Sequence, residues 1–310
     1  MTASKKKNKL KIYSGYKNIP NGTASFDITE GCLVLEGGGW RGLYTQGALD
    51  ALMEEGINFR NVIGVSAGAL SAMEYLSGQI GICARVNLKY RHDTNYCGIG
   101  AMLQDGGITG FTYFFKNITE REGFDWERFF QPDRRLLVSA ANLKTGEAEY
   151  FEKGKCNIRK AIKASATVPF ISKPVKINDI PYLDGGSVEK IPYKKAKEEG
   201  HEKIMVIRTR DRDYRRNEDS NAIKGLIRNG AYLRYPEFRK ALAQVNANYN
   251  RCVEEMTADE ESGRLFMLAP SERVDIKKFE GDMEKLGKLY ETGYEEMKAN
   301  MGALKEYLKA

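Results

Sequence analysis

Short apolar runs alternate with longer helix-like stretches along residues 31–197. Such runs, bounded by glycine or charged residues, are typical of buried strands, and the stretches between them have helical spacing. Regular alternation of the two favours a mostly parallel sheet covered by helices. The predicted strands are residues 32–35, 62–65, 136–140, 147–151 and 204–208, with 265–268 as a later one. The predicted helices are residues 43–55, 67–77, 158–165 and 193–199.

Two regions depart from this alternation. Residues 85–130 are irregular and rich in Gly, Tyr and Phe, and two interpretations stay open: an apolar lid or substrate wall, or an ordinary packing segment. Beyond Asp211 the chain becomes highly charged, and we expect helices over residues 221–261 and 279–308. The last helix is expected to pack on the rest of the chain, with membrane docking as the alternative. The chain is therefore divided into a basic lead-in (1–30), an α/β domain (31–210) and a mainly helical C-terminal extension (211–310).

The composition limits the classes of protein that fit. The chain has 310 residues, 42% of them hydrophobic, and no apolar run near the roughly 18 residues of a membrane-spanning helix. Its lysine-rich amino terminus lacks the apolar block of a secretory signal. Five scattered cysteines without CxxC spacing favour reduced thiols and a cytoplasmic location, and argue against a zinc site. The net charge of +7 favours a solubilising surface, with peripheral attraction to anionic membrane lipids as the alternative; no nucleic-acid partner is expected.

A serine stands in a tight turn between a predicted strand and a predicted helix. The segment Gly64-Val65-Ser66-Ala67-Gly68 follows the apolar pair Val62-Ile63. A serine hydroxyl is a weak nucleophile, so it must be exposed, strained and close to a base. Gly64 and Gly68 permit the sharp turn that a G-x-S-x-G sequence forms after a strand. Ser66 is therefore the candidate nucleophile, and a serine that only caps a helix is the weaker interpretation.

A glycine-rich loop follows the first predicted strand. In Glu36-Gly37-Gly38-Gly39-Trp40-Arg41-Gly42, consecutive glycines let backbone N–H groups approach a ligand that a Cβ would exclude. Beside an ester, such groups would bind the oxygen that becomes negative during attack. Arg41 could support the loop or add positive potential.

The same loop fits a rival function. Residues 37–42 satisfy G-x-G-x-x-G, and Glu54 or Glu55 lies near the distance expected for a ribose-binding acid. A dinucleotide site is therefore the main alternative. It leaves the serine turn unexplained, and Trp40 would crowd a pyrophosphate.

Only two histidines are present, which limits how a serine could be activated. His92 lies in a polar segment, and His201 precedes the strand at residues 204–208. A Ser–Asp–His triad would need its histidine beyond the carboxyl end of a strand, so that arrangement is disfavoured. A carboxylate held against the hydroxyl can serve as the base instead.

Asp184 is the best candidate for that carboxylate. In Leu183-Asp184-Gly185-Gly186 a short strand-like segment precedes the acid, and Gly185 and Gly186 leave room for a close approach. Asp105 stands in an identical Asp-Gly-Gly tripeptide, but no strand precedes it, so we expect a turn there.

Five arginines cluster after the strand at residues 204–208. If that strand is parallel to the one before Ser66, their loop rises on the same edge of the sheet and would suit a phosphate headgroup. The alternative is a solvated charged turn neutralised by neighbouring acids. The five are Arg208, Arg210, Arg212, Arg215 and Arg216.

Taken together, the glycine loop, the serine turn and Leu183-Asp184-Gly185-Gly186 resemble the patatin-like phospholipase family. Residues 164–170 resemble that family's Ala-Ser-x-x-x-Pro stretch, and the match covers about residues 31–210. The resemblance implies a three-layer α/β/α sandwich and a Ser–Asp dyad that needs no histidine, metal or cofactor. It also implies hydrolysis of phospholipid or other acyl-lipid esters. The chain departs from the common pattern at Glu36 and Asn142, where many relatives have Asp or another acid.

Carried over position by position, the resemblance implies Ser66 as nucleophile and Asp184 as base. It implies the N–H groups of Gly37, Gly38 and Gly39 as donors to the oxyanion. Supporting positions are Arg41, Gly64, Gly68, Gly185 and Gly186. A catalytically silent lipid-binding relative stays open beside the nucleotide-binding alternative.

Overall fold

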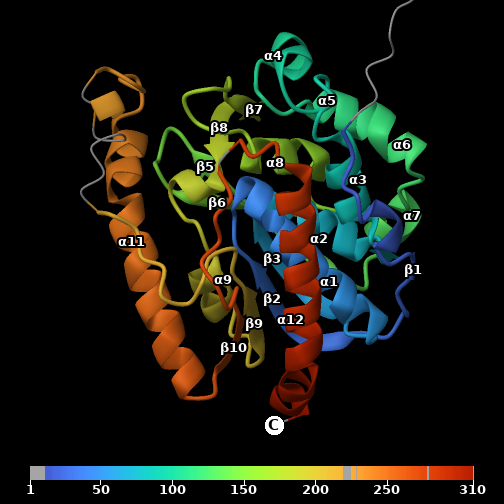
Figure 1. Cartoon of the computed structure of the whole chain (residues 1–310). Coiled ribbons are helices and arrows are strands. Elements are labelled where there is room, and N and C mark those ends of the chain that lie inside the picture. The colour runs from blue at the N-terminus through green and yellow to red at the C-terminus, as the bar shows by residue number, and fades with distance from the viewer. Residues whose placement is uncertain (1–10, 219–224, 228, 278, 310) are drawn as a thin grey trace, which may run out of the picture.

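The structure, a computed structural model, describes residues 11–218, 225–227, 229–277 and 279–309. Its centre is an eight-stranded sheet (Figure 1). The strands of this sheet are β2 (Thr29–Leu35), β3 (Phe59–Val65), β5 (Arg135–Asn142), β6 (Ala148–Glu152), β7 (Val175–Ile177), β8 (Ile180–Asp184), β9 (Ile204–Ile207) and β10 (Leu265–Leu268). Their order is β10-β9-β2-β3-β5-β8-β7, and β6 also pairs with β5. A separate pair is formed by β1 (Gly22–Thr23) and β4 (Gln79–Ile80).

The strand directions follow the predicted pattern over most of the sheet. The five strands from β10 to β5 are mutually parallel. In contrast, β6 and β8 run antiparallel to β5, and β7 runs antiparallel to β8. The sheet is therefore mostly parallel, as predicted, with an antiparallel part beyond β5.

Helices surround this sheet, and a further group of helices and turns fills the insertion between α3 and β5. The helices outside this insertion are α1 (Gly42–Glu54), α2 (Ala67–Leu76), α3 (Ile82–Tyr90), α8 (Ile158–Ser165), α9 (Tyr193–Glu198), α11 (Pro236–Glu261) and α12 (Met283–Lys309). The short helices of the insertion are α4 (Ile99–Asp105), α5 (Phe111–Tyr113), the π-helix η3 (Phe114–Ile118), α6 (Thr119–Arg121) and α7 (Trp126–Phe130). Three single turns are η1 (Tyr16–Asn18), η2 (Gly39–Arg41) and η4 (Gly185–Ser187).

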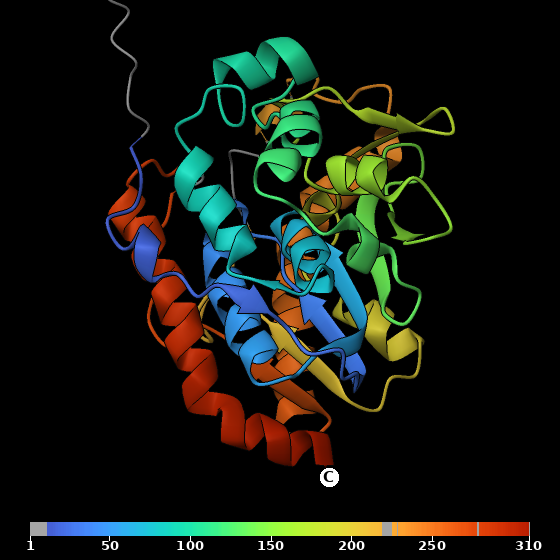
Figure 2. The same cartoon turned by 90° about the vertical axis from the view of Figure 1, so that its right-hand side faces the viewer.

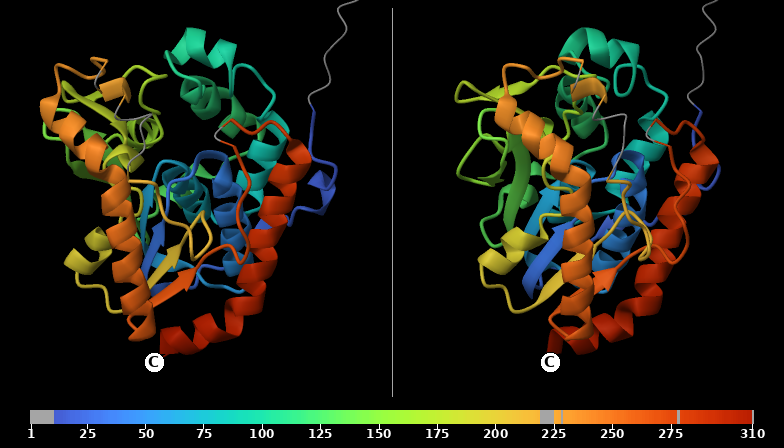
Figure 3. Two further views of the ribbon diagram at one scale, coloured as in Figure 1. Left: turned by 60° about the vertical axis from the view of Figure 1, so that its left-hand side comes forward. Right: turned by 90° about the vertical axis from the view of Figure 1, so that its left-hand side faces the viewer.

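Both faces of the sheet are covered by helices, because alternate side chains of a strand point to opposite faces. On β2, Leu33 and Leu35 belong to a core shared with α1, α2 and α12. Cys32 and Val34 belong to a second core, shared with α9 and α11. Figures 1 and 3 show the resulting three layers, with α11 on one side of the sheet and α1 and α12 on the other. The predicted α/β/α sandwich is confirmed.

The irregular insertion forms a cluster of short helices beside the main helices. Figure 2 shows this segment coloured teal to green, with α4 at the top of the molecule in that view. Tyr96, Phe114 and Phe124 from this segment belong to the main core, so part of it packs as an ordinary structural layer. Residues 82–90, by contrast, form the regular helix α3.

The C-terminal part of the chain is built into the sheet. β10 adds an edge strand parallel to β9, and α12 packs along α1. Gly47 and Gly293 lie where these two helices cross. A Cβ at Gly47 would stand 2.1 Å from the Tyr290 carbonyl oxygen, and one at Gly293 would stand 2.0 Å from that of Tyr44. The two helices therefore meet backbone to backbone.

The two C-terminal helical regions differ from their predicted bounds. In the first, expected over residues 221–261, residues 225–227 are helical, turns follow over residues 229–234, and α11 begins at Pro236; residues 219–224 and 228 lie outside the described part. Proline favours the first turn of a helix, where no backbone N–H donor is needed. The expected helix over residues 279–308 begins at Met283, because the Asp282 carboxylate accepts the N–H of Glu284 at 3.0 Å. Across the described helices, none has the length and apolarity needed to cross a bilayer.

Candidate active site

Ser66 occupies the turn between β3 and α2 in a strained conformation. Its backbone has φ 57° and ψ −122°, a region that residues with a Cβ rarely adopt. The neighbouring glycines allow this turn to pack tightly. A Cβ at Gly64 would lie 2.7 Å from the Gly68 carbonyl oxygen, and a Cβ at Gly68 would lie 2.4 Å from that of Leu35. The predicted strand–turn–helix around Ser66 is confirmed.

Asp184 ends β8 at a point that the pairing of β5 determines. β3 pairs with Arg135–Ser139 of β5 and ends with Val65 opposite Ser139. β8 pairs with the next positions of β5, and Asp184 lies opposite Ala140. β6 pairs with positions of β5 that also pair with β3 or with β8. Each strand has two edges, so β6 lies on one edge of β5, and β3 and β8 both lie on the other. The ends of β3 and β8 therefore meet end to end, which brings Ser66 and Asp184 together.

The two side chains are hydrogen-bonded. Ser66 Oγ donates to Asp184 Oδ2 at 2.8 Å, and the N–H of Gly186 donates to Asp184 Oδ1 at 2.8 Å. Ser66 is 8% exposed. A Cβ at Gly185 would lie 2.5 Å from the carbonyl oxygen of Ser139 on β5, so only glycine fits at this position next to Asp184. The carboxylate is thus oriented by one backbone bond and points at the serine hydroxyl.

A further serine ties this turn to the sheet. Ser165, the last residue of α8, accepts the N–H of Ser66 at 2.8 Å and donates to the Ser139 carbonyl at 2.6 Å. Through this bridge the backbone N–H of Ser66 has a partner, and the turn is linked to β5. The Ala-Ser motif at residues 164–165 marked the position in the sequence, but only the fold shows the contact.

The glycine loop lies directly against Ser66. A Cβ at Gly37 would be 3.1 Å from Ser66 Cβ, and a Cβ at Gly38 would be 2.7 Å from Thr209 Oγ1. Gly39 has φ +56° and faces open space. The N–H of Gly37 donates to the Lys190 carbonyl at 3.2 Å, so that N–H is already engaged.

The two departures from the family pattern have structural partners of their own. Glu36 is buried, and its Oε2 accepts the N–H of Thr209 at 2.6 Å. Asn142 Oδ1 accepts the N–H of Lys144 at 2.9 Å and thereby shapes the turn after β5. Neither side chain bonds to Ser66 or Asp184 in the described hydrogen bonds.

A cavity of about 540 Å³ opens beside Ser66 and Asp184. Its walls are largely apolar and come from segments far apart in the chain. The insertion contributes one wall, as the substrate-wall interpretation expects, and α11 contributes another. The apolar wall residues include Leu43, Leu70, Tyr96, Ile108, Phe111, Phe114, Val168, Phe170, Leu242 and Val245.

Cationic side chains line the same cavity. The cationic residues in its lining are Arg41, Lys190, Arg210 and Arg216. The arginine loop was expected near Ser66 if the strand before it runs parallel to β3, and this holds because β9 is parallel to β2 and β2 is parallel to β3. The loop divides, however: Arg212 points away and binds Glu260 at 2.5 Å. Sequence reasoning missed Lys190, which no motif marks.

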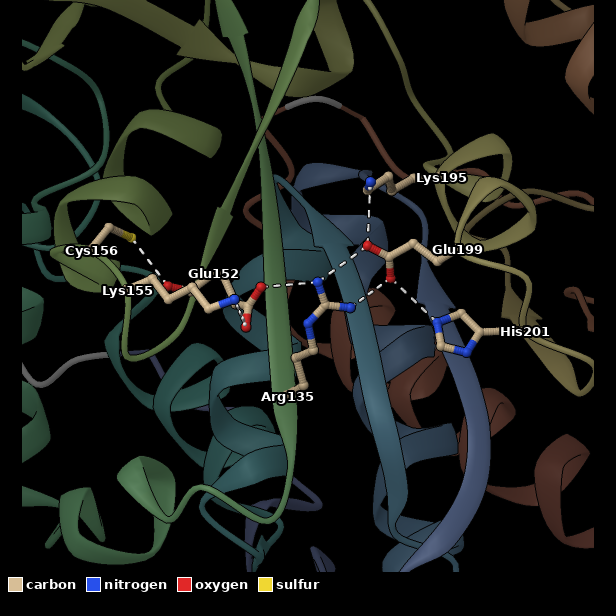
Figure 4. A network of polar contacts seen from close by, with 7 residues as sticks. All are labelled: Arg135, Glu152, Lys155, Cys156, Lys195, Glu199 and His201. Carbon is tan, nitrogen blue, oxygen red and sulfur yellow. Dashed lines mark hydrogen bonds and ion pairs between the residues drawn. The ribbon is translucent and has the colours of Figure 1, made fainter.

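The histidines lie outside the site. His92 Nε2 is 2.9 Å from the Gly281 carbonyl oxygen on the surface. His201 lies 3.4 Å from Glu199, which also binds Arg135 and Lys195 in the network of Figure 4. Arg135 begins β5, at the end opposite to Ser139 and the serine turn. Within the described residues, no group of three or more His, Cys, Asp or Glu side chains is arranged to hold a metal ion.

The remaining candidates also lie elsewhere. Asp105, predicted to lie in a turn, is the last residue of α4; it accepts the N–H of Thr112 at 2.9 Å and pairs with Lys163. Glu54 and Glu55 stand at the end of α1, about 18 Å along the helix from the glycine loop. They bind Tyr294 and Lys305 of α12. The acid that a dinucleotide site would need is therefore not beside the loop.

Comparison with known proteins gives two family matches. Residues 33–87, which contain the glycine loop and the serine turn, match the model of the patatin-like phospholipase family. Residues 235–309 match a domain of unknown function, DUF6363. This second match covers α11, β10 and α12.

Individual proteins are similar over part of their length. Uncharacterized protein YjjU of Escherichia coli (strain K12) is 29% identical over 182 residues, which cover 57% of this chain and 51% of YjjU. Probable lipid hydrolase 463L of Invertebrate iridescent virus 6 is 29% identical over 181 residues, 52% of this chain and 61% of that protein. The matches thus span between about half and three fifths of these relatives. The crystal structure of VipD from Legionella pneumophila aligns with 99% of this chain and 72% of its own, at a TM-score of 0.49 and 14% identity.

The family match falls on the two motifs that the structure places against each other, and a lipid-hydrolase relative aligns with about half of the chain. The resemblance to the patatin-like phospholipase family is therefore confirmed, and it rests on residues 33–87.

Proposed function

We propose that this protein hydrolyses carboxylic esters of lipids, with Ser66 as nucleophile and Asp184 as general base. The observation that carries the proposal is the 2.8 Å hydrogen bond from Ser66 Oγ to Asp184 Oδ2 at the edge of an apolar cavity. The family and the relative named a probable lipid hydrolase support lipid esters as the substrate class. Phospholipids or other acyl lipids fit the largely apolar walls.

The proposed reaction has two halves. Asp184 accepts the Ser66 proton while Ser66 Oγ forms a bond to the ester carbonyl carbon, and the tetrahedral intermediate then collapses to an acyl-enzyme. The departing alcohol takes the proton from Asp184. A water molecule then gives its proton to Asp184 and attacks the acyl-enzyme, which releases the fatty acid and restores Ser66. No histidine is needed in either half.

We assign stabilisation of the oxyanion to the glycine loop. Gly38 and Gly39 line the cavity next to Ser66, and their N–H groups are the proposed donors. Gly37 can add a third donor only by releasing the Lys190 carbonyl, to which its N–H is bonded. Loss of one such donor would cost about 3–4 kcal/mol of transition-state stabilisation.

The test combines covalent labelling with turnover. A fluorophosphonate should transfer its phosphonyl group to Ser66 Oγ with loss of fluoride, and Ser66→Ala should take up no label. Ser66→Ala and Asp184→Asn should each lower p-nitrophenyl ester turnover by at least about 10³-fold. Circular dichroism would show whether both variants keep the native fold.

Asp105→Asn is the matched control, because Asp105 stands in the same Asp-Gly-Gly tripeptide but ends α4 and does not line the cavity of Ser66 and Asp184. It should retain turnover per folded molecule. Turnover that survives in Ser66→Ala or Asp184→Asn, or a label on another serine, would overturn the assignment. A protein that takes up no label and turns over no ester would instead be a silent lipid-binding relative.

A further inference from the structure

The wall that α2 gives to the cavity changes from apolar to polar with distance from Ser66. Ser66, Leu70 and Glu74 all line the cavity, and they follow one another at every fourth position of the chain. Residues at this spacing share one face of a helix. Glu74 lies about 12 Å from Ser66 along the helix axis, given the ordinary helical rise per residue. The cavity therefore extends from Ser66 along α2, past an apolar side chain, to a carboxyl group.

The wall that α1 gives to the cavity has the same order. Leu43 and Gln46 both line the cavity and lie about one turn apart, with Leu43 nearer to the glycine loop. The two helices begin side by side, because a Cβ at Gly42 would stand 3.0 Å from the Cβ of Ala67. Each helix thus places a leucine near the start of the cavity and a polar side chain further along it.

These two polar side chains are buried and have unused hydrogen-bonding atoms. Gln46 is 5% exposed and Glu74 is 4% exposed. Gln46 Oε1 and Glu74 Oε2 are both buried without a hydrogen-bond partner in the described structure. The neighbouring polar groups of the lining differ, because the Tyr96 hydroxyl donates to Asn87 Oδ1 at 2.8 Å. A buried polar atom without a partner is costly, so two of them in one cavity wall indicate a place for a polar group of a ligand.

The chemistry of Gln46 and Glu74 suits a hydroxyl group. Burial, and next to it the charge of Asp50, raise the pKa of Glu74 well above 4.5, so its carboxyl keeps a proton at pH values where an exposed glutamate has lost it. A protonated carboxyl can donate a hydrogen bond, and the Gln46 amide oxygen can accept one. A hydroxyl group both donates and accepts, so it can serve both side chains. A methyl group in its place would serve neither.

We infer that the acyl chain of the lipid ester cleaved here carries a hydroxyl group at its far end, which Gln46 and Glu74 bind inside the cavity. This inference rests on the proposed function and narrows its substrate class to esters of hydroxylated fatty acids. Along the two helices, Leu43 and Leu70 come before the polar side chains. The hydroxyl therefore belongs at the end of an apolar spacer and not beside the scissile bond.

The main experiment compares p-nitrophenyl esters of fatty acids with and without a terminal hydroxyl group. Hexanoate, octanoate, decanoate and dodecanoate would be assayed as monomers, and selectivity is the kcat/KM of the hydroxylated ester divided by that of the plain ester. The native selectivity should exceed unity and peak at octanoate or decanoate, because the hydroxyl must reach about 12 Å along α2. A selectivity below unity at every length, or one that does not depend on length, would overturn the inference.

Three variants and a matched control assign the selectivity to the two side chains. Gln46→Met and Glu74→Met keep the side-chain length without the hydrogen-bonding oxygens, and each should lower the peak selectivity by about ten-fold. Glu74→Gln keeps a donor and an acceptor and should stay within about three-fold of the native value. The control is Thr45→Val, because Thr45 Oγ1 is also buried on α1 without a partner in the described structure, but Thr45 does not line the cavity. Native selectivity in both Met variants, or an equal loss in Thr45→Val, would count against the inference.

A binding measurement separates this inference from the proposed chemistry. Calorimetry of Ser66→Ala with the methyl esters of octanoic and decanoic acid, with and without the terminal hydroxyl, needs no turnover, so it gives an answer even if hydrolysis fails. At one of the two lengths the hydroxylated ester should bind at least as tightly as the plain ester, whereas a purely apolar pocket would bind it about ten-fold more weakly. Weaker binding at both lengths would contradict the inference. Tighter binding of methyl ω-aminodecanoate would mean that Glu74 binds a cation as a carboxylate, which would also contradict it.

Discussion

Ser66 combines a strained backbone with a polar side chain aimed at Asp184. A φ of 57° with a ψ of −122° is compatible with glycine but unfavourable for any residue that has a Cβ. The strain persists because Ser165 binds the Ser66 N–H and Gly64 and Gly68 pack closely on either side. This conformation holds the Ser66 hydroxyl at the edge of the cavity. The backbone strain lowers the stability of the folded protein.

This strain predicts a difference between two inactive variants. Ser66→Gly should be more stable than Ser66→Ala by about 1 kcal/mol, because glycine relieves a backbone cost that exceeds its own entropic disadvantage. Both variants lack the hydroxyl, so the lost bond to Asp184 cancels in the comparison. Urea unfolding monitored by circular dichroism measures the difference, and equal midpoints would show that the turn is not strained in solution.

Glu74, in the cavity lining, is a second residue that lowers the stability of the folded protein. It is buried on α2, and its Oε2 has no hydrogen-bond partner in the described structure. Burial, and next to it the charge of Asp50, raise the pKa of Glu74 well above its ordinary value of 4.5. The folded protein therefore keeps this proton at a pH where the unfolded chain has lost it.

The difference in the pKa of Glu74 between the folded and unfolded states determines how the stability of the protein changes with pH. Since the folded state binds the extra proton, Glu74 makes the protein less stable as the pH rises above 4.5. Glu74→Gln should match the native stability near pH 4 and exceed it increasingly toward pH 8. Thermal unfolding at a series of pH values would measure this, and a constant difference across the series would contradict it.

At the scale of elements, the contact between α1 and α12 depends on two glycines. Gly47 and Gly293 allow the helix backbones to meet, and a side chain at either position would press on a carbonyl of the other helix. Such overpacking against backbone cannot be relieved by a rotamer change. α1 follows the glycine loop directly, so separation of these helices would also disturb the active-site edge.

Gly47→Ala and Gly293→Ala should therefore each destabilise the protein by about 2 kcal/mol or more. Gly302→Ala is the matched control on α12, because a Cβ there meets nothing within 4 Å. It should stabilise the protein by about 1 kcal/mol, the ordinary helical preference of alanine over glycine. Similar effects of all three substitutions would mean that the close crossing does not exist in solution.

The elements that could be predicted were those encoded locally. The strand and turn at Ser66, the helix at residues 158–165 and the strand at residues 265–268 follow from apolar runs and small residues. The turns at residues 229–234 before α11 were not predicted, and α12 was predicted to begin too early, since charged helical composition continues across those turns and across the cap at Asp282. Hydrophobic periodicity is averaged over many residues, so it cannot locate the single residue at which a helix begins.

The residues of the candidate site could be chosen from the sequence, but their geometry could not. Ser66 and Asp184 carried recognisable neighbours, yet their contact depends on the pairing of both strands with β5, which no local pattern reveals. The arginine loop shows the same limit: Arg210 faces the cavity while Arg212 pairs with Glu260 of α11. Lys190 had no motif, and only its surroundings identify it.

At the scale of the whole molecule, the segment that matches the domain of unknown function is not a separate appendage of the sheet. It supplies β10 to the sheet, Leu242 and Val245 to the cavity, and α12 to the face of α1. The domain boundary at residue 210 stays a prediction. The segments before and after residue 210 contribute strands to the same sheet. Elements that share a core are expected to unfold together.

The intact chain should accordingly unfold in one cooperative transition. Far-ultraviolet circular dichroism reports the helices, and fluorescence reports Trp40 at the glycine loop and Trp126 on α7. The two signals should give the same urea midpoint. An earlier loss of helix signal, with tryptophan fluorescence still native, would mean that α11 and α12 detach on their own.

The end-to-end meeting of β3 and β8 on a shared edge of β5 has an evolutionary consequence. Residues 66 and 184 are 118 positions apart, but their separation in space is held by adjacent rungs of one strand. The intervening chain, including the part that lines the cavity, can lengthen, shorten or change its composition while Ser66 and Asp184 keep their positions. New substrates can thus be accommodated by remodelling that segment alone, provided that no residue is inserted into or deleted from β5.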